Sequence, residues 1–143
     1  MLMGSYQNSI DAKNRLIIPA KFRDELGFRC VLTRGLDSCL VIYPEKTWEA
    51  QQSKLASLPM SDKKARAFKR YIYENATELE IDKQGRVLLP QSFKDAVHIE
   101  KDLVTIGMLD RVEIWAKEIY DGDELGGKLS PEDFTDFSDF YQI

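Results

Sequence analysis

The sequence predicts an α+β protein, mainly β, made of two tandem copies of one small unit. A 15-residue segment that begins at Ile10 recurs at Ile81 with a constant offset of 71. The similarity resumes downstream with an offset of 72, and short apolar runs alternate with turn residues in both copies. One unit of roughly 50 residues is too short to bury a core alone. The two copies are therefore expected to pack on each other as an intrachain pseudo-dimer.

The first copy divides into short strands, a turn and one helix. The turn is predicted at Asp11–Arg15, because Asn14 tolerates the positive φ that such turns require. An apolar strand, Leu16–Ile18, follows it, and Pro19 suits the first position of a helix that ends at Gly27. The remaining predicted features are the apolar helix positions Phe22 and Leu26 and the strands Cys30–Thr33 and Leu40–Tyr43.

The second copy follows the same order. Its turn is predicted at Asp82–Arg86, with Gly85 at the position of positive φ, and the strand Val87–Leu89 comes next. Pro90 again suits a helix start. His98 stands where the first helix has its terminal glycine, so a capping or surface role is expected for this histidine. The remaining predicted features are the apolar positions Phe93 and Val97 and the strands Leu103–Ile106 and Val112–Trp115.

Two helices are predicted between the copies. One runs from Glu45 to Ser57 and stops near Pro59, and the second is capped by Ser61 and continues to Asn75. An apolar stripe of the second helix is expected to lie in the core: Ala65, Phe68 and Ile72. The opposite face of this helix is basic and consists of Lys63, Lys64, Arg66, Lys69 and Arg70. This face is either simply solvated or part of a surface for an anionic partner. The chain is thus divided into a first unit at 1–50, a helical linker at 51–75, a second unit at 76–120 and a tail at 121–143.

Charge is distributed unevenly along the chain. The formal net charge of the 143 residues is −4, which taken whole disfavours a nucleic-acid partner. Residues 1–75, however, hold 13 Lys and Arg against 8 Asp and Glu, or +5, whereas the tail holds one Lys and seven acids, or −6. Without the tail, residues 1–120 carry +2. The sequence therefore indicates a positively biased body with an acidic appendage.

Several classes of function are disfavoured by the residues that the chain contains. No apolar run approaches the ~18 residues of a membrane span, and no signal peptide is visible at the start. Cys30 and Cys39 lie in apolar surroundings and are expected to be reduced core residues of a cytoplasmic protein. His98 is the only histidine, so a metal site lacks ligands. Without a phosphate loop or a nucleophile elbow, neither enzymatic activity nor a cofactor is expected.

The two predicted turns share the polar pattern Asp-x-x-x-Arg. Asp11 and Asp82 are expected to hydrogen-bond the backbone amides of their turns, as aspartate commonly does. With Asn14 and Gly85 at the positions of positive φ, these aspartates are the residues expected to structure the turns. A carboxylate pair for catalysis is the competing interpretation, but no other catalytic group supports it.

The basic residues around the turns predict a surface for DNA. Arg15 and Arg86 follow the turns directly, and arginine can bind the O6 and N7 atoms of guanine in a bidentate manner. A salt bridge from arginine to aspartate within each turn is the alternative, but its repetition in two related units favours an anionic partner. Only Lys94 adds charge to the second helix, so the first half is expected to bind DNA more strongly. The predicted DNA-binding residues are Lys13, Arg15, Lys21, Arg23, Lys83 and Arg86.

The acidic tail is predicted to contain a short amphipathic helix. Ser130 suits an N-cap, Pro131 suits the first helical position, and acidic residues follow at the positive end of the helix dipole. Phe134, Phe137 and Tyr141 would share one face of this helix. Two roles remain open: the helix docks on its own assembly or on a neighbour, or the tail competes with DNA for the basic loops.

Four sequence motifs of the chain resemble those of a known protein family. They are Asp11–Arg23, Asp82–Pro90 and the stretch from Gly107 to Trp115, together with the start Met3–Tyr6. On these motifs the chain resembles the MraZ family, whose members contain two units of the SpoVT-AbrB or MazE swapped-hairpin type. The resemblance covers residues 1 to about 120. The chain departs from the family pattern at Asn14, where glycine is usual, and Lys83 lies one place earlier in its motif than Lys13 does.

The resemblance implies both a fold and a function. The fold would be an intrachain pseudo-dimeric β-barrel of two swapped-hairpin units with short helices. The function would be that of a sequence-specific DNA-binding transcriptional regulator, expected to be a repressor, that is cytoplasmic and associated with the nucleoid. Ring-shaped homo-oligomers would bind direct repeats in the promoter of the division and cell-wall gene cluster that includes its own gene. An alternative from another class is an antitoxin-like protein-interaction module, with no membrane partner in either case.

Overall fold

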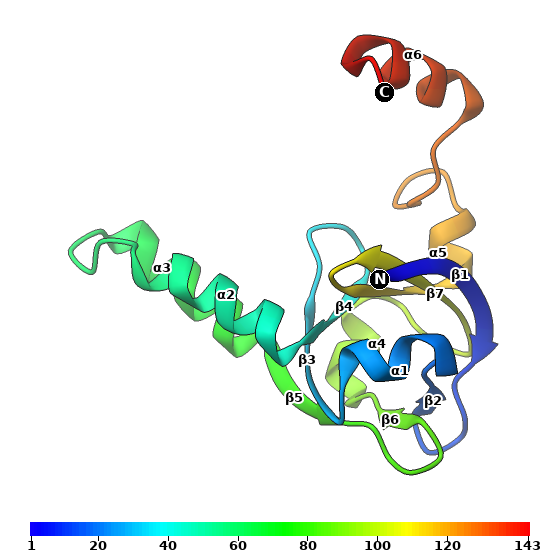
Figure 1. Ribbon diagram of the computed structural model, residues 1–143, viewed down its shortest axis with the longest axis horizontal. Coiled ribbons are helices and arrows are strands. Elements are labelled where there is room, and N and C mark those ends of the chain that lie inside the picture. Colours follow the sequence, from blue (N-terminus) through cyan, green and yellow to red (C-terminus); the bar gives the residue numbers. More distant parts are fainter.

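The structure is a computed structural model that describes residues 1–143, and it contains one six-stranded sheet, a separate two-stranded sheet and six helices (Figure 1). All strand pairs are antiparallel, and the order in the large sheet is β1-β7-β8-β4-β3-β5. The α+β class is confirmed. The strands are β1 (Leu2–Ser9), β2 (Arg15–Ile17), β3 (Arg29–Arg34), β4 (Leu40–Pro44), β5 (Ala76–Glu80), β6 (Arg86–Leu88), β7 (Asp102–Leu109) and β8 (Val112–Ala116). The helices are α1 (Ala20–Leu26), α2 (Glu45–Ala56), α3 (Lys63–Glu74), α4 (Gln91–Ala96), α5 (Lys117–Asp121) and α6 (Pro131–Tyr141).

Strand pairing crosses between the two copies of the repeat. The first strand of the first copy, β1, pairs with β7 of the second copy. The first strand of the second copy, β5, pairs with β3 of the first copy, and β2 pairs with β6. Because each copy receives a strand from the other, the two copies share one core instead of building two.

The closed β-barrel that was expected is not present. Strands β1 and β5 lie at the two edges of the six-stranded sheet, and each has one partner in it. Each copy has a turn after its first strand, and this turn separates the three-residue strands β2 and β6 from the long ladder. These strands pair only with each other, so the sheet stays open and the β2–β6 pair forms a second layer.

The main core lies between these layers and contains 20 buried residues. Phe22 and Leu26 of α1 are both fully buried, as their spacing predicted, and the Phe22 ring meets that of Tyr6 edge-on with centroids 5.2 Å apart. Each such apolar side chain stabilises the fold by about 1.5–3 kcal/mol. Leu16 and Val87 enter the same core from β2 and β6. The core thus fixes the position of the two-stranded sheet and of its turns.

The short helices begin one residue later than predicted. Pro19 and Pro90 have extended backbone, with ψ of 134° and 145°, and act as N-caps instead of first helical residues. Helix α1 ends at Gly27, whose φ is 77°, as predicted. After α4, His98 adopts a φ of 62° and is exposed, so it occupies the left-handed position of the missing glycine at the helix end.

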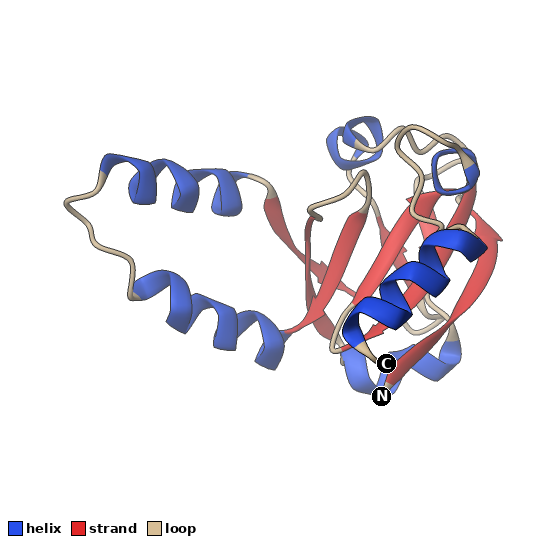
Figure 2. Ribbon diagram, turned by 90° about the horizontal axis from the view of Figure 1, so that it is seen from above, coloured by secondary structure: helices blue, strands red, loops and turns tan.

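Helices α2 and α3 form a hairpin that projects from the body (Figure 2). Two predictions for it were wrong. The N-cap of α3 is Asp62, whose Oδ1 accepts hydrogen bonds from Lys64 N at 2.8 Å and Ala65 N at 3.3 Å, and not Ser61. The apolar stripe of α3 is not in the core, because neither helix of the hairpin has a fully buried residue and Phe68 is 53% exposed.

Both cysteines are free and buried, as predicted. Burial raises the pKa of each thiol to about 12, and nearby Glu45 adds to this effect at Cys30. The two thiols therefore stay protonated and poorly nucleophilic at neutral pH. None of the six helices combines the length and the apolar character that crossing a membrane requires.

Candidate nucleic-acid interface

The two-stranded sheet of β2 and β6 presents one face to the core and one to the outside. In its register Arg15 lies opposite Leu88, Leu16 opposite Val87, and Ile17 opposite Arg86. Because side chains alternate along a strand, the central pair points inward, and each is 1% exposed. The outer face therefore carries the two arginines on one diagonal and two aliphatic side chains on the other.

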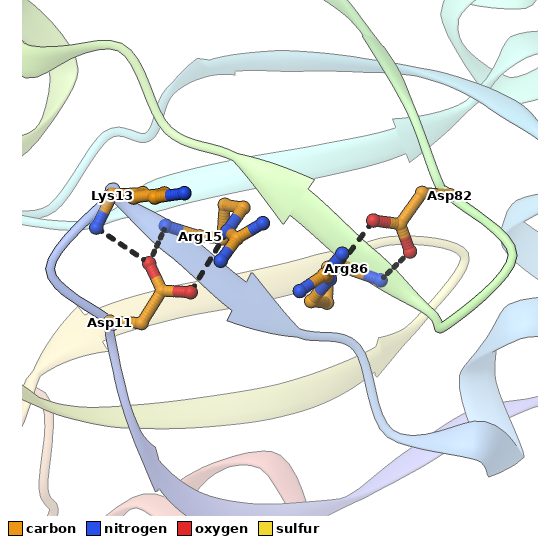
Figure 3. A network of polar contacts seen from close by, with 5 residues as sticks. All are labelled: Asp11, Lys13, Arg15, Asp82 and Arg86. Atoms are coloured by element: carbon orange, nitrogen blue, oxygen red, sulfur yellow. Dashed lines mark hydrogen bonds and ion pairs between the residues drawn. The ribbon is translucent and has the colours of Figure 1, made fainter.

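The first turn is closed by Asp11. Its Oδ1 accepts hydrogen bonds from the backbone N–H groups of Lys13 at 2.9 Å and Arg15 at 2.8 Å. Its Oδ2 accepts from Arg15 Nε at 2.9 Å, so one carboxylate holds both the turn backbone and the arginine side chain (Figure 3). The expectation that this aspartate binds turn amides is confirmed, and the alternative salt bridge is present as well.

The second turn repeats this geometry. Oδ1 of Asp82 accepts from the backbone N–H groups of Gln84 and Arg86, both at 2.9 Å, and Oδ2 accepts from Arg86 Nε at 3.0 Å. The pKa of each aspartate is lowered, first by the backbone hydrogen bond from the arginine of its own turn. Both carboxylates are therefore ionised at neutral pH and fix their arginines by charge-assisted hydrogen bonds.

The salt bridges orient the two arginines and leave most of their hydrogen-bond donors free. Each guanidinium donates from Nε to its aspartate. The two Nη groups of Arg15 and the two of Arg86 have no hydrogen-bond partner in the structure. Their side chains are 31% and 29% exposed, and Figure 3 shows them beside each other across the β2–β6 pair. Four Nη nitrogens in two fixed guanidinium planes are thus available to acceptors on a partner.

Each turn is also supported by the short helix of the opposite copy. Asn14 and Gly85 adopt positive φ values of 61° and 79°, as predicted. Nζ of Lys94 on α4 donates to Asn14 Oδ1 at 2.7 Å. The guanidinium of Arg23 on α1 covers Gly85 so closely that a Cβ there would overlap it. Arg23 and Lys94 are equivalent positions of the repeat, so the support is reciprocal.

These contacts divide the predicted DNA-binding residues into two groups. Arg23 is partly buried and its Nε donates to the carbonyl of Ile18 at 2.9 Å, so it positions the opposite turn. Lys94, expected to add surface charge, is only 8% exposed. The lysines, in contrast, are exposed and form no ion pair: Lys13, Lys21 and Lys83. Lys13 and Lys83 belong to the two turns and Lys21 to α1, and all three remain free positive charges.

Two residues of this surface were missed by the sequence reasoning. Ile17 and Leu88 are 52% and 58% exposed, although both were predicted as ordinary strand residues of an apolar run. The inward positions Leu16 and Val87 could have revealed them, because their neighbours in a strand must point outward. The outer face is therefore a small ribbon with apolar and cationic side chains together.

The outer face of the ribbon combines guanidinium donors with apolar side chains. The major groove of B-DNA admits a two-stranded antiparallel ribbon, in which arginine pairs with guanine and apolar side chains contact thymine methyl groups. The chain contains no group of three or more His, Cys, Asp or Glu side chains that could hold a metal ion.

The MraZ family model, described as MraZ protein and as antitoxin-like, matches the chain in two segments, residues 1–71 and 72–124. The chain belongs to the MraZ family. The two matched segments each contain one Asp-x-x-x-Arg turn, so the family match covers both halves of the candidate interface.

Curated relatives extend this similarity over the whole chain. The transcriptional regulator MraZ of Thermoanaerobacter sp. (strain X514) is 48% identical over 143 residues, which is 100% of both chains. The protein of the same name from Thermoanaerobacter pseudethanolicus is 49% identical over the same length. That of Clostridium beijerinckii is 52% identical over 118 residues, or 82% of this chain and 83% of the relative.

Proposed function

We propose that this protein is a sequence-specific DNA-binding transcriptional regulator and that the outer face of the β2–β6 ribbon reads DNA. The observation that carries the proposal is the pair of aspartate-oriented arginines, Arg15 and Arg86, with four unpaired Nη groups on one narrow face. The names of the MraZ relatives, transcriptional regulators, support the same function.

In this proposal the residues have separate roles. Arg15 and Arg86 bind guanine O6 and N7, because two Nη donors match these two acceptors. The exposed lysines bind phosphates, since an ammonium is a point charge without a fixed orientation. The residues with the phosphate role are Lys13, Lys21 and Lys83. Asp11 and Asp82 position the arginines, and Arg23 positions the turn at Gly85.

The finer features belong to the same proposal. The reciprocal strand pairing, with β1 on β7 and β5 on β3, supports assignment of the two units to the swapped-hairpin AbrB type. We propose that the protein acts as a repressor on the nucleoid and binds direct repeats upstream of the division and cell-wall gene cluster that includes its own gene. A ring-shaped homo-oligomer suits direct repeats, because several weak contacts multiply through avidity.

A competition gel shift tests the proposed function. We expect the full chain to bind the DNA upstream of its own gene at least about 1,000-fold more tightly than a scrambled fragment of equal length and composition at fixed salt. Specific contacts to base edges give this preference, whereas phosphate contacts alone would give none. Equal affinities for the two fragments would contradict sequence-specific binding.

An antitoxin-like interaction module is the second candidate, and the description of the family model as antitoxin-like favours keeping it. It predicts a stoichiometric protein partner bound in the absence of DNA. Purification after nuclease treatment separates the candidates, because a co-purifying protein together with equal affinities in the gel shift would support the module and not the regulator.

A further inference from the structure

Helix α6 has no extensive packing against the rest of the chain, and all of its residues except Ser138 are exposed. Ser130 caps it by accepting a hydrogen bond from Asp133 N at 3.0 Å, so the helix is well formed by its own residues, as predicted. Its aromatic side chains are nevertheless open to solvent. Their exposed fractions are 64% for Phe134, 61% for Phe137, 79% for Phe140 and 55% for Tyr141. An apolar face of this size on a short helix indicates a binding partner.

The segment before α6 is fixed on the body, so the helix leaves it at a defined place. Asp121 accepts a hydrogen bond from Lys117 at 2.7 Å and forms an ion pair with Lys128 at 2.6 Å. The ammonium of Lys128 also lies over the ring of Tyr120. From this anchor α6 stands clear of the sheet and of the α2–α3 hairpin (Figure 1).

A groove of matching character lies between the helical hairpin and the sheet. Its walls are the tip of the β3–β4 hairpin, strand β8 and the inner sides of α2 and α3. Leu36 at the tip is 107% exposed and Phe68 on α3 is 53% exposed, so the apolar lining reaches solvent. The apolar residues of the groove that matter for docking are Leu36, Trp48, Leu55, Leu58, Phe68 and Ile72.

The charges of the two elements are complementary. Helix α6 carries four acidic residues and no basic one: Glu132, Asp133, Asp136 and Asp139. The groove is lined by three basic residues, Arg34, Lys54 and Arg111, and by two acidic ones, Asp37 and Glu113. The five basic residues of α3 do not line the groove, but they add positive charge to the outer side of its wall. An acidic helix with aromatic anchors at i, i+3 and i+7 is the partner that such a groove accepts.

We propose that α6 of one copy docks in the groove between the α2–α3 hairpin and the sheet of a second copy. A second copy is the occupant because α6 stands clear of the α2–α3 hairpin of its own chain (Figure 1). No residue of the tail lines the groove of its own chain. The contact rests on the proposed self-association and names the two segments that meet, and it can be detected in the absence of DNA.

Disulfide trapping between two full-length variants tests the contact. Leu36→Cys places a thiol at the groove and Ser138→Cys places one beside the aromatic face of α6. The native cysteines are buried, so the introduced thiols are the reactive ones. In a mixture of the two variants, one of them tagged, we expect the mixed disulfide to form at least about tenfold faster than with Ser92→Cys on α4 in place of Leu36→Cys.

Two further arms make the result specific. Adding Phe134→Ala and Phe137→Ala to the Ser138→Cys chain should reduce trapping at least about tenfold, since aromatic anchors carry most of the energy of such contacts. Raising the salt from about 0.05 M to about 0.5 M should also reduce it, because the rim charges are screened. Trapping equal to that of the Ser92→Cys control would overturn the proposal. A normal gel shift in that case leaves the regulator function intact.

Discussion

Replacing both Arg15 and Arg86 by alanine is expected to lower the affinity for the upstream DNA by about 100-fold or more. One bidentate arginine–guanine pair contributes about 1–3 kcal/mol, and 1.4 kcal/mol corresponds to tenfold in affinity. The fold should persist, because both side chains lie on the outer face and their aspartates keep the hydrogen bonds to the turn backbone. The sequence predicted a stronger first half, but Lys21 lies on α1, whose Arg23 covers the second turn. Because both turns hold their arginines in the same geometry, the two single variants are expected to lose similar affinity. Fluorescence anisotropy with labelled DNA measures all three.

The matched control for this experiment is Lys63→Ala with Lys64→Ala on α3. It removes the same two positive charges from a surface remote from the ribbon (Figure 1). Its affinity should fall less than about threefold, because exposed charges beyond a Debye length of about 8–10 Å are screened. Equal losses in the two double variants would mean that net charge, and not the ribbon, governs binding.

Gly107→Val is expected to lower the free energy of unfolding by about 3 kcal/mol or more. Gly107 of β7 lies opposite Gly4 of β1, and the two backbones approach unusually closely there. A Cβ at this position would lie 2.5 Å from the Leu2 carbonyl carbon and 2.7 Å from Met3 Cα. Backbone atoms cannot move aside as a flexible side chain can, so β1 must separate from β7. Urea unfolding followed by circular dichroism measures the change.

Ser5→Val on the paired strand provides the control. Ser5 of β1 lies opposite Ile106 of β7 and is exposed, and valine is favoured in strands. Its cost should stay below about 1 kcal/mol. If Gly107→Val were as mild as this control, the close approach of β1 and β7 would not be a feature of the folded protein.

The repeat made much of this structure predictable from the sequence. The offset of 71 located both turns, and aspartate at positions 11 and 82 indicated the hydrogen bonds to the turn backbone. The apolar spacing of Phe22 and Leu26 located the buried side of α1. Such features depend on residues close in the chain, and local sequence therefore specifies them.

Other features depend on contacts between distant segments and were not predictable. Nothing in the local sequence distinguishes Arg23 or Lys94 from the exposed basic residues, because each becomes a support only when the opposite turn lies beneath it. The sheet stays open because β2 pairs with β6 alone. Helix α3 has an apolar stripe typical of a core helix, yet the hairpin that contains it extends beyond the body. Helix α5 was not predicted, because its five residues are too few to show a helical pattern.

Guanine readout by the ribbon depends on the N7 acceptor in the major groove, so DNA without this atom tests it. The affinity of the full chain is compared for the same upstream fragment made with guanine or with 7-deazaguanine, which lacks the N7 acceptor but pairs normally. We expect the modified DNA to bind at least about tenfold more weakly, because one half of each bidentate contact is lost. The variant with alanine at positions 15 and 86 should not distinguish the two fragments. Equal affinity of the unaltered chain for both would contradict readout of guanine in the major groove.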